Sequence, residues 1–222
     1  MVKNETITVK RHSFLYRMLH WLIVAEVLLL LLTGFGVSDY LPFGVMSRGA
    51  GRSLHIVLGL GWMGTITFFV YNFVMSGEYN WFGVSKIGNA FDFFVHEIRC
   101  LVGGKKIENP VGYEVDEKRY VEKIMATEVL AWWGWLALWI AMILTGLALL
   151  FPESLSLVNR LCHGLLPSFR HATAATRVIH TVISLVIVVY IMIHAYASWA
   201  FGMIGSMISG NKEERIIASK KL

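Results

Sequence analysis

The hydrophobic residues of the chain are gathered into four long blocks, separated by segments rich in charged and turn-forming residues. The blocks cover about residues 15–37, 54–75, 129–151 and 173–203. A helix of about 20 residues, rising about 1.5 Å per residue, can cross the roughly 30 Å of hydrocarbon in a bilayer. The pattern therefore predicts an all-α membrane protein, a bundle of four transmembrane helices in one domain over residues 1–222.

The first block lies near the N-terminus, where a cleaved signal peptide could be mistaken for a helix. Its apolar stretch is longer than the about 7–15 residues of a signal peptide. No small-residue cleavage site follows it, because Thr33-Gly34-Phe35-Gly36 leads into a turn-rich segment ending at Pro42. We therefore expect this helix to be retained.

Basic residues are distributed unevenly over the segments that connect the blocks. Most of the 20 lysines and arginines lie before the first block, in the loop of residues 76–128, and in the C-terminal tail. Cytoplasmic segments of membrane proteins carry such an excess of positive charge. We therefore expect both termini and the 76–128 loop to be cytoplasmic, and we attribute the net charge of +5 to topology rather than to nucleic-acid binding.

The composition agrees with a membrane protein and narrows the cofactor chemistry. The chain is 56% hydrophobic with a mean hydropathy of +0.59, against about 45–50% apolar residues in soluble domains. Its two cysteines, Cys100 and Cys162, fall on opposite sides of the predicted membrane, so we expect no disulfide between them. The chain lacks the Cys-x-x-Cys-His of c-type haem attachment, and an iron–sulfur cluster needs about four cysteines.

The 76–128 loop contains a stretch, residues 90–99, that mixes aromatic and charged side chains. This mixture is typical of a helix that lies on the membrane surface. A helix that docks on a partner protein would show the same pattern. Both interpretations stay open at this point.

The eight histidines fall into two groups. Four lie outside the apolar blocks, where a histidine needs no special explanation: His12, His96, His163 and His171. The other four lie within or at the edges of the blocks: His20, His55, His180 and His194. Ionisable residues inside a membrane are rare and usually functional, so the second group contains the candidate site residues.

The four membrane histidines match in depth as two pairs. His20 and His194 lie near the inner ends of their helices, and His55 and His180 near the outer ends. His180 and His194 are 14 residues apart, which is about 21 Å along a helix and within roughly 40° of one face. Paired imidazoles inside a helix bundle suit iron ligation. We therefore predict two non-covalent b-type haems, the outer on His55 and His180 and the inner on His20 and His194.

The motif Arg-x-x-His occurs three times at helix entries, beginning at Arg17, Arg52 and Arg177. Residues three apart share a helix face, and in each motif the arginine is nearer to water. A guanidinium there could pair with haem propionates. In the alternative interpretation, the arginines extend to the membrane surface and the histidines pack locally.

Several motifs resemble those of one family of membrane cytochromes over about residues 10–201. They are Arg17-Met-Leu-His20-Trp21 with Thr33-Gly34, Arg52-Ser-Leu-His55 with Gly59, Thr145-Gly146, and His180 with His194. The chain resembles the cytochrome b (gamma) subunit of membrane-bound formate dehydrogenases. That subunit belongs to a wider group that includes the cytochrome b subunits of nickel–iron hydrogenases and thiosulfate reductases.

The resemblance implies a membrane anchor that carries electrons and leaves catalysis to partner chains. It implies that the outer haem takes electrons from an external iron–sulfur subunit, which is fed by a molybdenum or tungsten formate dehydrogenase subunit. The inner haem would then reduce a quinone near the cytoplasmic face of the prokaryotic inner membrane, as part of a respiratory chain. No catalytic residue is assigned to this chain.

The loop departs from the pattern of that family. The family carries Pro-x-Gly-Lys-Tyr-Asn, whereas Pro110-Val111-Gly112-Tyr113-Glu114 lacks the lysine and the asparagine. The asparagine is a quinone-site residue in the family, so only His194 is carried over as bordering a quinone site. Glu26 and Glu128 could deliver protons, or could pair with neighbours or face a partner.

Two other functions compete with the first. One is the equivalent subunit of a nickel–iron hydrogenase, a thiosulfate reductase or a related oxidoreductase. The other is a haem-free four-helix transporter or scaffold, in which the histidines bind a metal or move protons.

Overall fold

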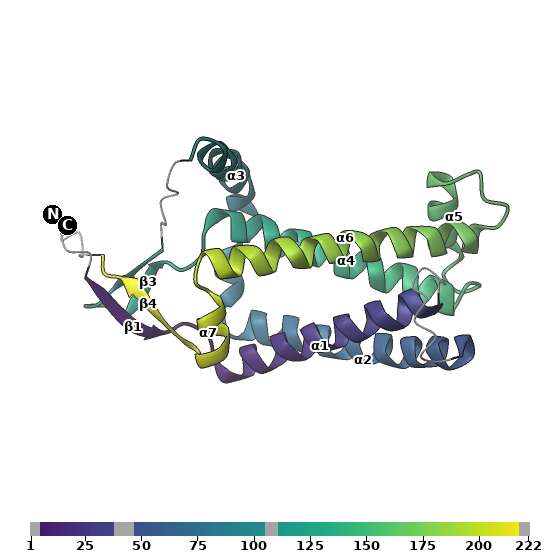
Figure 1. The fold of residues 1–222 in the computed structure, drawn as a ribbon, viewed down its shortest axis with the longest axis horizontal. Coiled ribbons are helices and arrows are strands. Elements are labelled where there is room, and N and C mark those ends of the chain that lie inside the picture. Colours follow the sequence, from purple (N-terminus) through teal and green to yellow (C-terminus); the bar gives the residue numbers. More distant parts are fainter. Residues whose placement is uncertain (1–4, 38–46, 105–110, 218–222) are drawn as a thin grey trace. The chain divides into compact units, whose positions relative to one another are not determined.

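The computed structural model describes residues 5–37, 47–104 and 111–217 of the chain. Four of its helices are long and apolar enough to cross a membrane: α1 (Phe14–Val37), α2 (Arg48–Met75), α4 (Ala126–Leu150) and α6 (Ala172–Ala200). They coincide with the four predicted blocks, which confirms the all-α membrane class. Figure 1 shows the four helices, labelled α1, α2, α4 and α6.

The helix boundaries differ from the predicted ones where local capping extends a helix beyond its apolar stretch. Helix α2 begins at Arg48, and the hydroxyl of Ser47 accepts a hydrogen bond from the Ala50 N–H at 3.3 Å, as an N-cap does. Helix α4 begins three residues before the apolar block, and the Glu128 carboxylate accepts from the Met125 N–H at 3.0 Å. Glu128 therefore has a structural role in capping.

The chain forms two compact units, and each long helix has residues in both. The helical unit comprises Met18–Tyr71 and Leu136–Tyr196. The terminal unit comprises Met1–Arg17, Asn72–Trp135 and Ala197–Leu222.

The helical unit contains parts of all four long helices and a short helix, α5 (Ser156–Leu165). A buried polar network fixes α5 to its neighbours. The Asn159 side-chain amide donates to the Ala148 carbonyl of α4 at 3.1 Å, and the Thr176 hydroxyl of α6 donates to Asn159 at 2.7 Å. Since buried polar groups need partners, this network holds α5 firmly on the ends of both helices.

The terminal unit joins the two ends of the chain in one small sheet. Strand β1 (Thr6–Lys10) pairs antiparallel with β4 (Asn211–Arg215), as Figure 1 shows. A second pair, β2 (Gly112–Glu114) and β3 (Arg119–Glu122), forms a hairpin. None of these strands was predicted from the sequence. Their pairing places both termini in one unit, in agreement with the expectation that both lie on the same side of the membrane.

Buried ion pairs stabilise the terminal unit. Arg11 is buried and donates to Glu214 at 2.5 Å and to the Lys123 carbonyl at 2.6 Å. Lys123 in turn pairs with Glu78. Burial lowers the pKa of Lys212, and the nearby Arg11 adds to this effect. Breaking one partner of a buried pair would leave an uncompensated charge, so these contacts hold β1, β4 and the entry to α4 together.

Helix α3 (Ile87–Val102) contains the stretch for which a loop helix was predicted. Two short 3₁₀ helices, Glu78–Phe82 and Val84–Lys86, precede it, and α7 (Ile204–Ser209) lies near the C-terminus. Ala90 of α3 is fully buried against Ile124 and Val129. The helix also exposes apolar side chains, among them Phe91, Phe94 and Ile98. These three positions lie within about 100° of Ala90 around the helix, so α3 packs within the unit and beside that contact exposes an apolar surface suited to lipid or to a partner.

The two cysteines are both free and buried. Cys100 belongs to the terminal unit and Cys162 to the helical unit.

Candidate functional site

The four membrane histidines meet in the two pairs that their depths predicted, all within the helical unit. The rings of His55 on α2 and His180 on α6 have centres 6.3 Å apart, with their planes at 84°. The rings of His20 on α1 and His194 on α6 have centres 6.4 Å apart, with their planes at 48°. Helix α6 thus contributes one histidine to each pair.

These separations are the ones expected for two imidazoles that share one iron. A metal–imidazole bond is about 2 Å long, and a ring nitrogen lies about 1.2 Å from the ring centre, so two rings on opposite sides of one metal have centres about 6.4 Å apart. Direct ring packing does not require this spacing at two independent sites. Both pairs therefore fit bis-imidazole ligation.

The ring of His55 is held in one tautomer by Thr33. The Thr33 hydroxyl donates its single hydrogen to the Leu29 carbonyl, at 2.8 Å, and lies 3.0 Å from His55 Nδ1. With its hydrogen on that carbonyl, the hydroxyl accepts the Nδ1–H of His55 in the tautomer that carries its proton on Nδ1. The lone pair of Nε2 is therefore available for a metal, which is the usual arrangement of a metal-binding histidine.

His180 is held in the same way by Thr145. The Thr145 hydroxyl donates to the Ala141 carbonyl at 2.7 Å and lies 2.8 Å from His180 Nδ1. The outer pair thus consists of two rings, each oriented by a threonine on a neighbouring helix.

A glycine follows each of these threonines and makes room for the histidine ring. A Cβ at Gly34 would lie 3.1 Å from His55 Cε1, and a Cβ at Gly146 would lie 3.4 Å from His180 Cε1. The sequence analysis noted the two Thr-Gly dipeptides only as motifs of a family. Their repetition on two helices was the available signal that each orients a ligand.

In the inner pair, the ring of His20 lacks the hydrogen bond that orients each outer ring. Within the described residues, His20 Nδ1 is buried without a hydrogen-bond partner. The ring of His20 meets the ring of Trp21 edge-on, with centres 5.4 Å apart. Packing, rather than a threonine, therefore sets the position of this ring.

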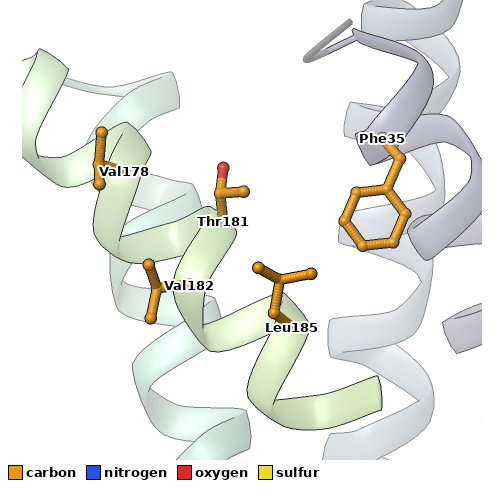
Figure 2. Close-up of a pocket in the computed structure, with 5 residues that line it drawn as sticks. All are labelled: Phe35, Val178, Thr181, Val182 and Leu185. Atoms are coloured by element: carbon orange, nitrogen blue, oxygen red, sulfur yellow. The ribbon is translucent and has the colours of Figure 1, made fainter. Parts of the chain in front are cut away.

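An apolar cavity of about 360 Å³ is lined by side chains of α1 and α6. Figure 2 shows its lining, with the Phe35 ring of α1 across from side chains of α6: Val178, Thr181, Val182 and Leu185. Phe35 follows Gly34 in sequence, and Thr181 follows His180. At about 100° per residue, these α6 side chains lie roughly 100–200° around the helix from His180. The cavity therefore opens on another face of α6 than the one that carries the two ligands, and it is not assigned to a haem.

The described residues contain no group of three or more His, Cys, Asp or Glu side chains that could hold a metal ion. Each pair offers two nitrogen ligands, whereas protein sites for a bare metal such as zinc use three or four ligands. A haem supplies four ligands of its own and needs one or two from the protein. The donor set therefore fits haem better than a free ion.

The three predicted arginines have different surroundings. Arg52 and Arg177 are exposed in the second turns of α2 and α6. Arg17, in the terminal unit, donates to the Ile208 carbonyl, and its guanidinium lies 5.8 Å from the centre of the Phe14 ring. Arg17 therefore has a structural partner, while the other two arginines can reach a group at the protein surface.

The histidines outside the helical core make local contacts. His12 stacks on Tyr16 with ring centres 5.3 Å apart, His96 Nε2 lies 3.4 Å from Cys100 Sγ, and His163 Nε2 lies 2.9 Å from the Phe169 carbonyl. His171 is exposed.

Four membrane-crossing helices that carry paired imidazoles in this geometry define a membrane cytochrome of the b type. The family of prokaryotic cytochrome b561 matches residues 11–210, and the chain belongs to this family. A search of curated proteins finds no match. The chain is thus a multi-pass protein of the prokaryotic cell membrane that binds b-type haem and transfers electrons as part of a redox system.

Proposed function

We propose that the chain holds two b-type haems and passes electrons between them across the membrane. His55 and His180 would bind the outer haem, and His20 and His194 the inner one. The observation that carries this proposal is the ring separation of 6.3 and 6.4 Å at two levels. Bound haem supplies one-electron iron chemistry, and the chain supplies the axial ligands and an environment that excludes water.

The exposed arginines at the outer helix ends would serve the outer haem. Arg52 and Arg177 each lie one helical turn before a ligand of that haem. A guanidinium pairs well with a carboxylate such as a propionate. Arg17 would contribute to the inner haem only if it released the Ile208 carbonyl.

We further propose that the chain is the membrane anchor of a respiratory formate dehydrogenase. The motifs around the four histidines support this choice. The electron donor would be an iron–sulfur subunit bound to a molybdenum or tungsten catalytic subunit, and the final acceptor a quinone near His194. Gly112, Tyr113 and Glu114 of the altered loop motif form β2, and Pro110 lies outside the described residues.

A second candidate is the equivalent subunit of a nickel–iron hydrogenase or thiosulfate reductase. The match to the family fits this candidate equally well. Membership of a cytochrome family argues against the haem-free transporter or scaffold.

Purification of the intact complex in mild detergent tests these proposals together. We expect two haems per chain and co-purification of an iron–sulfur subunit. Anaerobic addition of formate should reduce the haems, and hydrogen should not. Reduction by hydrogen alone would make the chain a hydrogenase subunit and would leave the two-haem assignment intact.

A further inference from the structure

One carboxyl group lies deep within the apolar helices of the helical unit. Glu26 is on α1, six residues beyond His20 and seven residues before Thr33, which contacts His55. At about 1.5 Å per residue it lies about 9 Å from the inner level and about 10 Å from the outer one. In the described helices, Glu26 and Tyr190 are the only titratable side chains between the two levels.

The two oxygens of Glu26 have different surroundings. Oε1 accepts a hydrogen bond from the Thr65 hydroxyl of α2 at 2.9 Å. The same helix comes close at Gly61, where a Cβ would lie 3.9 Å from Oε1. Oε2 is buried and has no hydrogen-bond partner within the described residues. The contacts of Glu26 with α2 include no charged group, and between the two levels α4 offers no titratable side chain and α6 only Tyr190.

A carboxylate with one hydrogen bond is expensive in such an environment unless a positive charge is nearby. A ferric b-type haem core carries one net positive charge, because the porphyrin offsets two of the three iron charges. The ferrous core carries none. Reduction therefore removes the charge that would stabilise an ionised Glu26, and favours its protonated form.

We propose that Glu26 is a redox-linked proton-binding site between the two haems. Glu26 would take up one proton from a hydronium ion of the solvent when an electron reaches a neighbouring haem, and would return it to water when the electron leaves. The proposed donor would supply the electron that reduces ferric to ferrous iron, one O–H bond of the hydronium ion would break, and one O–H bond would form on the carboxylate. The proposal rests on the two-haem function above, whose donor supplies the electron.

Two variants separate proton binding from a purely structural role. Glu26→Gln keeps an oxygen that can accept from Thr65 but cannot titrate. Thr65→Val is its matched control, because it removes that hydrogen bond and keeps the titrating carboxyl.

The test is an equilibrium redox titration of both haems at several pH values, on the purified complex. In the wild-type protein the midpoint potentials should fall as pH rises. In Glu26→Gln this dependence should be lost or reduced for at least one haem, whereas Thr65→Val should keep it. A pH dependence in Glu26→Gln equal to that of the wild type would overturn the proposal.

Infrared difference spectra of the wild-type protein keep the proposal testable if Glu26→Gln does not assemble. Reduction should produce the carbonyl band of a protonated carboxyl, shifted in D₂O, and its absence would also overturn the proposal. The haem content is measured first. A preparation without two haems counts against the proposed function, and a two-haem preparation with no Glu26 effect counts against Glu26 alone.

Discussion

The outer and inner histidine pairs have nearly the same spacing but are supported differently. At the outer level, Thr33 and Thr145 each fix a ring nitrogen, and a glycine beside each threonine leaves space for the ring. At the inner level, His20 Nδ1 has no such partner among the described residues.

Both rings of the outer pair are therefore oriented by the protein before the cofactor binds, whereas the ring of His20 depends more on the cofactor for its final orientation. Groups that orient a metal ligand typically change metal affinity by about 10- to 100-fold. A site held by such groups loses less freedom on binding, and therefore binds more tightly. We expect the outer haem to be the more firmly held of the two.

The largest effects should come from removing a ligand, and they should separate the two levels. His55→Ala or His180→Ala should lose the outer haem, and His20→Ala or His194→Ala the inner one, because an apolar side chain cannot coordinate iron. The measured haem content should fall from two per chain to one in each variant. Two haems in all four variants would refute the assignment.

The next largest effect should come from the threonines. Thr33→Val and Thr145→Val remove the acceptor of each Nδ1–H at nearly constant volume, and should weaken outer-haem binding by about 10- to 100-fold each. Reconstitution of the apoprotein with measured amounts of haem would show this. Thr33→Ser and Thr145→Ser are the matched controls. Equal weakening of the inner haem would contradict the comparison.

A smaller effect should distinguish the two glycines. Gly34→Ala would place a Cβ 3.1 Å from His55 Cε1, and Gly146→Ala one 3.4 Å from His180 Cε1. Overpacking typically costs about 1–3 kcal/mol, and only the first contact is clearly too close. Thermal release of haem, followed by absorbance, should occur earlier in Gly34→Ala than in Gly146→Ala. The opposite order would mean that α1 moves to accommodate the added methyl group more easily than α4 does.

The smallest effect should come from the exposed arginines. Arg177→Gln removes a positive charge near the outer haem and should lower its midpoint potential slightly, since solvent screens exposed charges. The midpoint potential of the inner haem should not change. Arg17→Gln should instead lower the thermal stability of the protein, because Arg17 bonds to the Ile208 carbonyl. If Arg177→Gln shifted the midpoint potential of the inner haem more than that of the outer one, Arg177 would not lie near the outer haem.

The sequence predicted the features that depend on hydrophobicity and depth. Four apolar blocks were enough to locate the helices, and the pairing of His20 with His194 and of His55 with His180 followed from their distances along those helices. The role of Thr33 could not be predicted, because it depends on which way a hydroxyl points. The repetition of Thr-Gly on two helices indicated that the two threonines have the same role, but not what that role is.

The terminal sheet was missed for a different reason. Strand β4 has the sequence Asn211-Lys-Glu-Glu-Arg215, which is polar throughout and shows no alternation. It is stabilised by pairing with β1 at the other end of the chain and by the buried contact of Arg11 with Glu214. Such long-range pairing leaves little signal in a local pattern.

The central claim is that each histidine pair binds one haem iron through both imidazoles. Its most direct test is the haem content and low-temperature electron paramagnetic resonance spectrum of the oxidised, purified wild-type protein. The account predicts two low-spin ferric b-type haems per chain. A single haem, or a high-spin signal from five-coordinate iron in the intact protein, would contradict it.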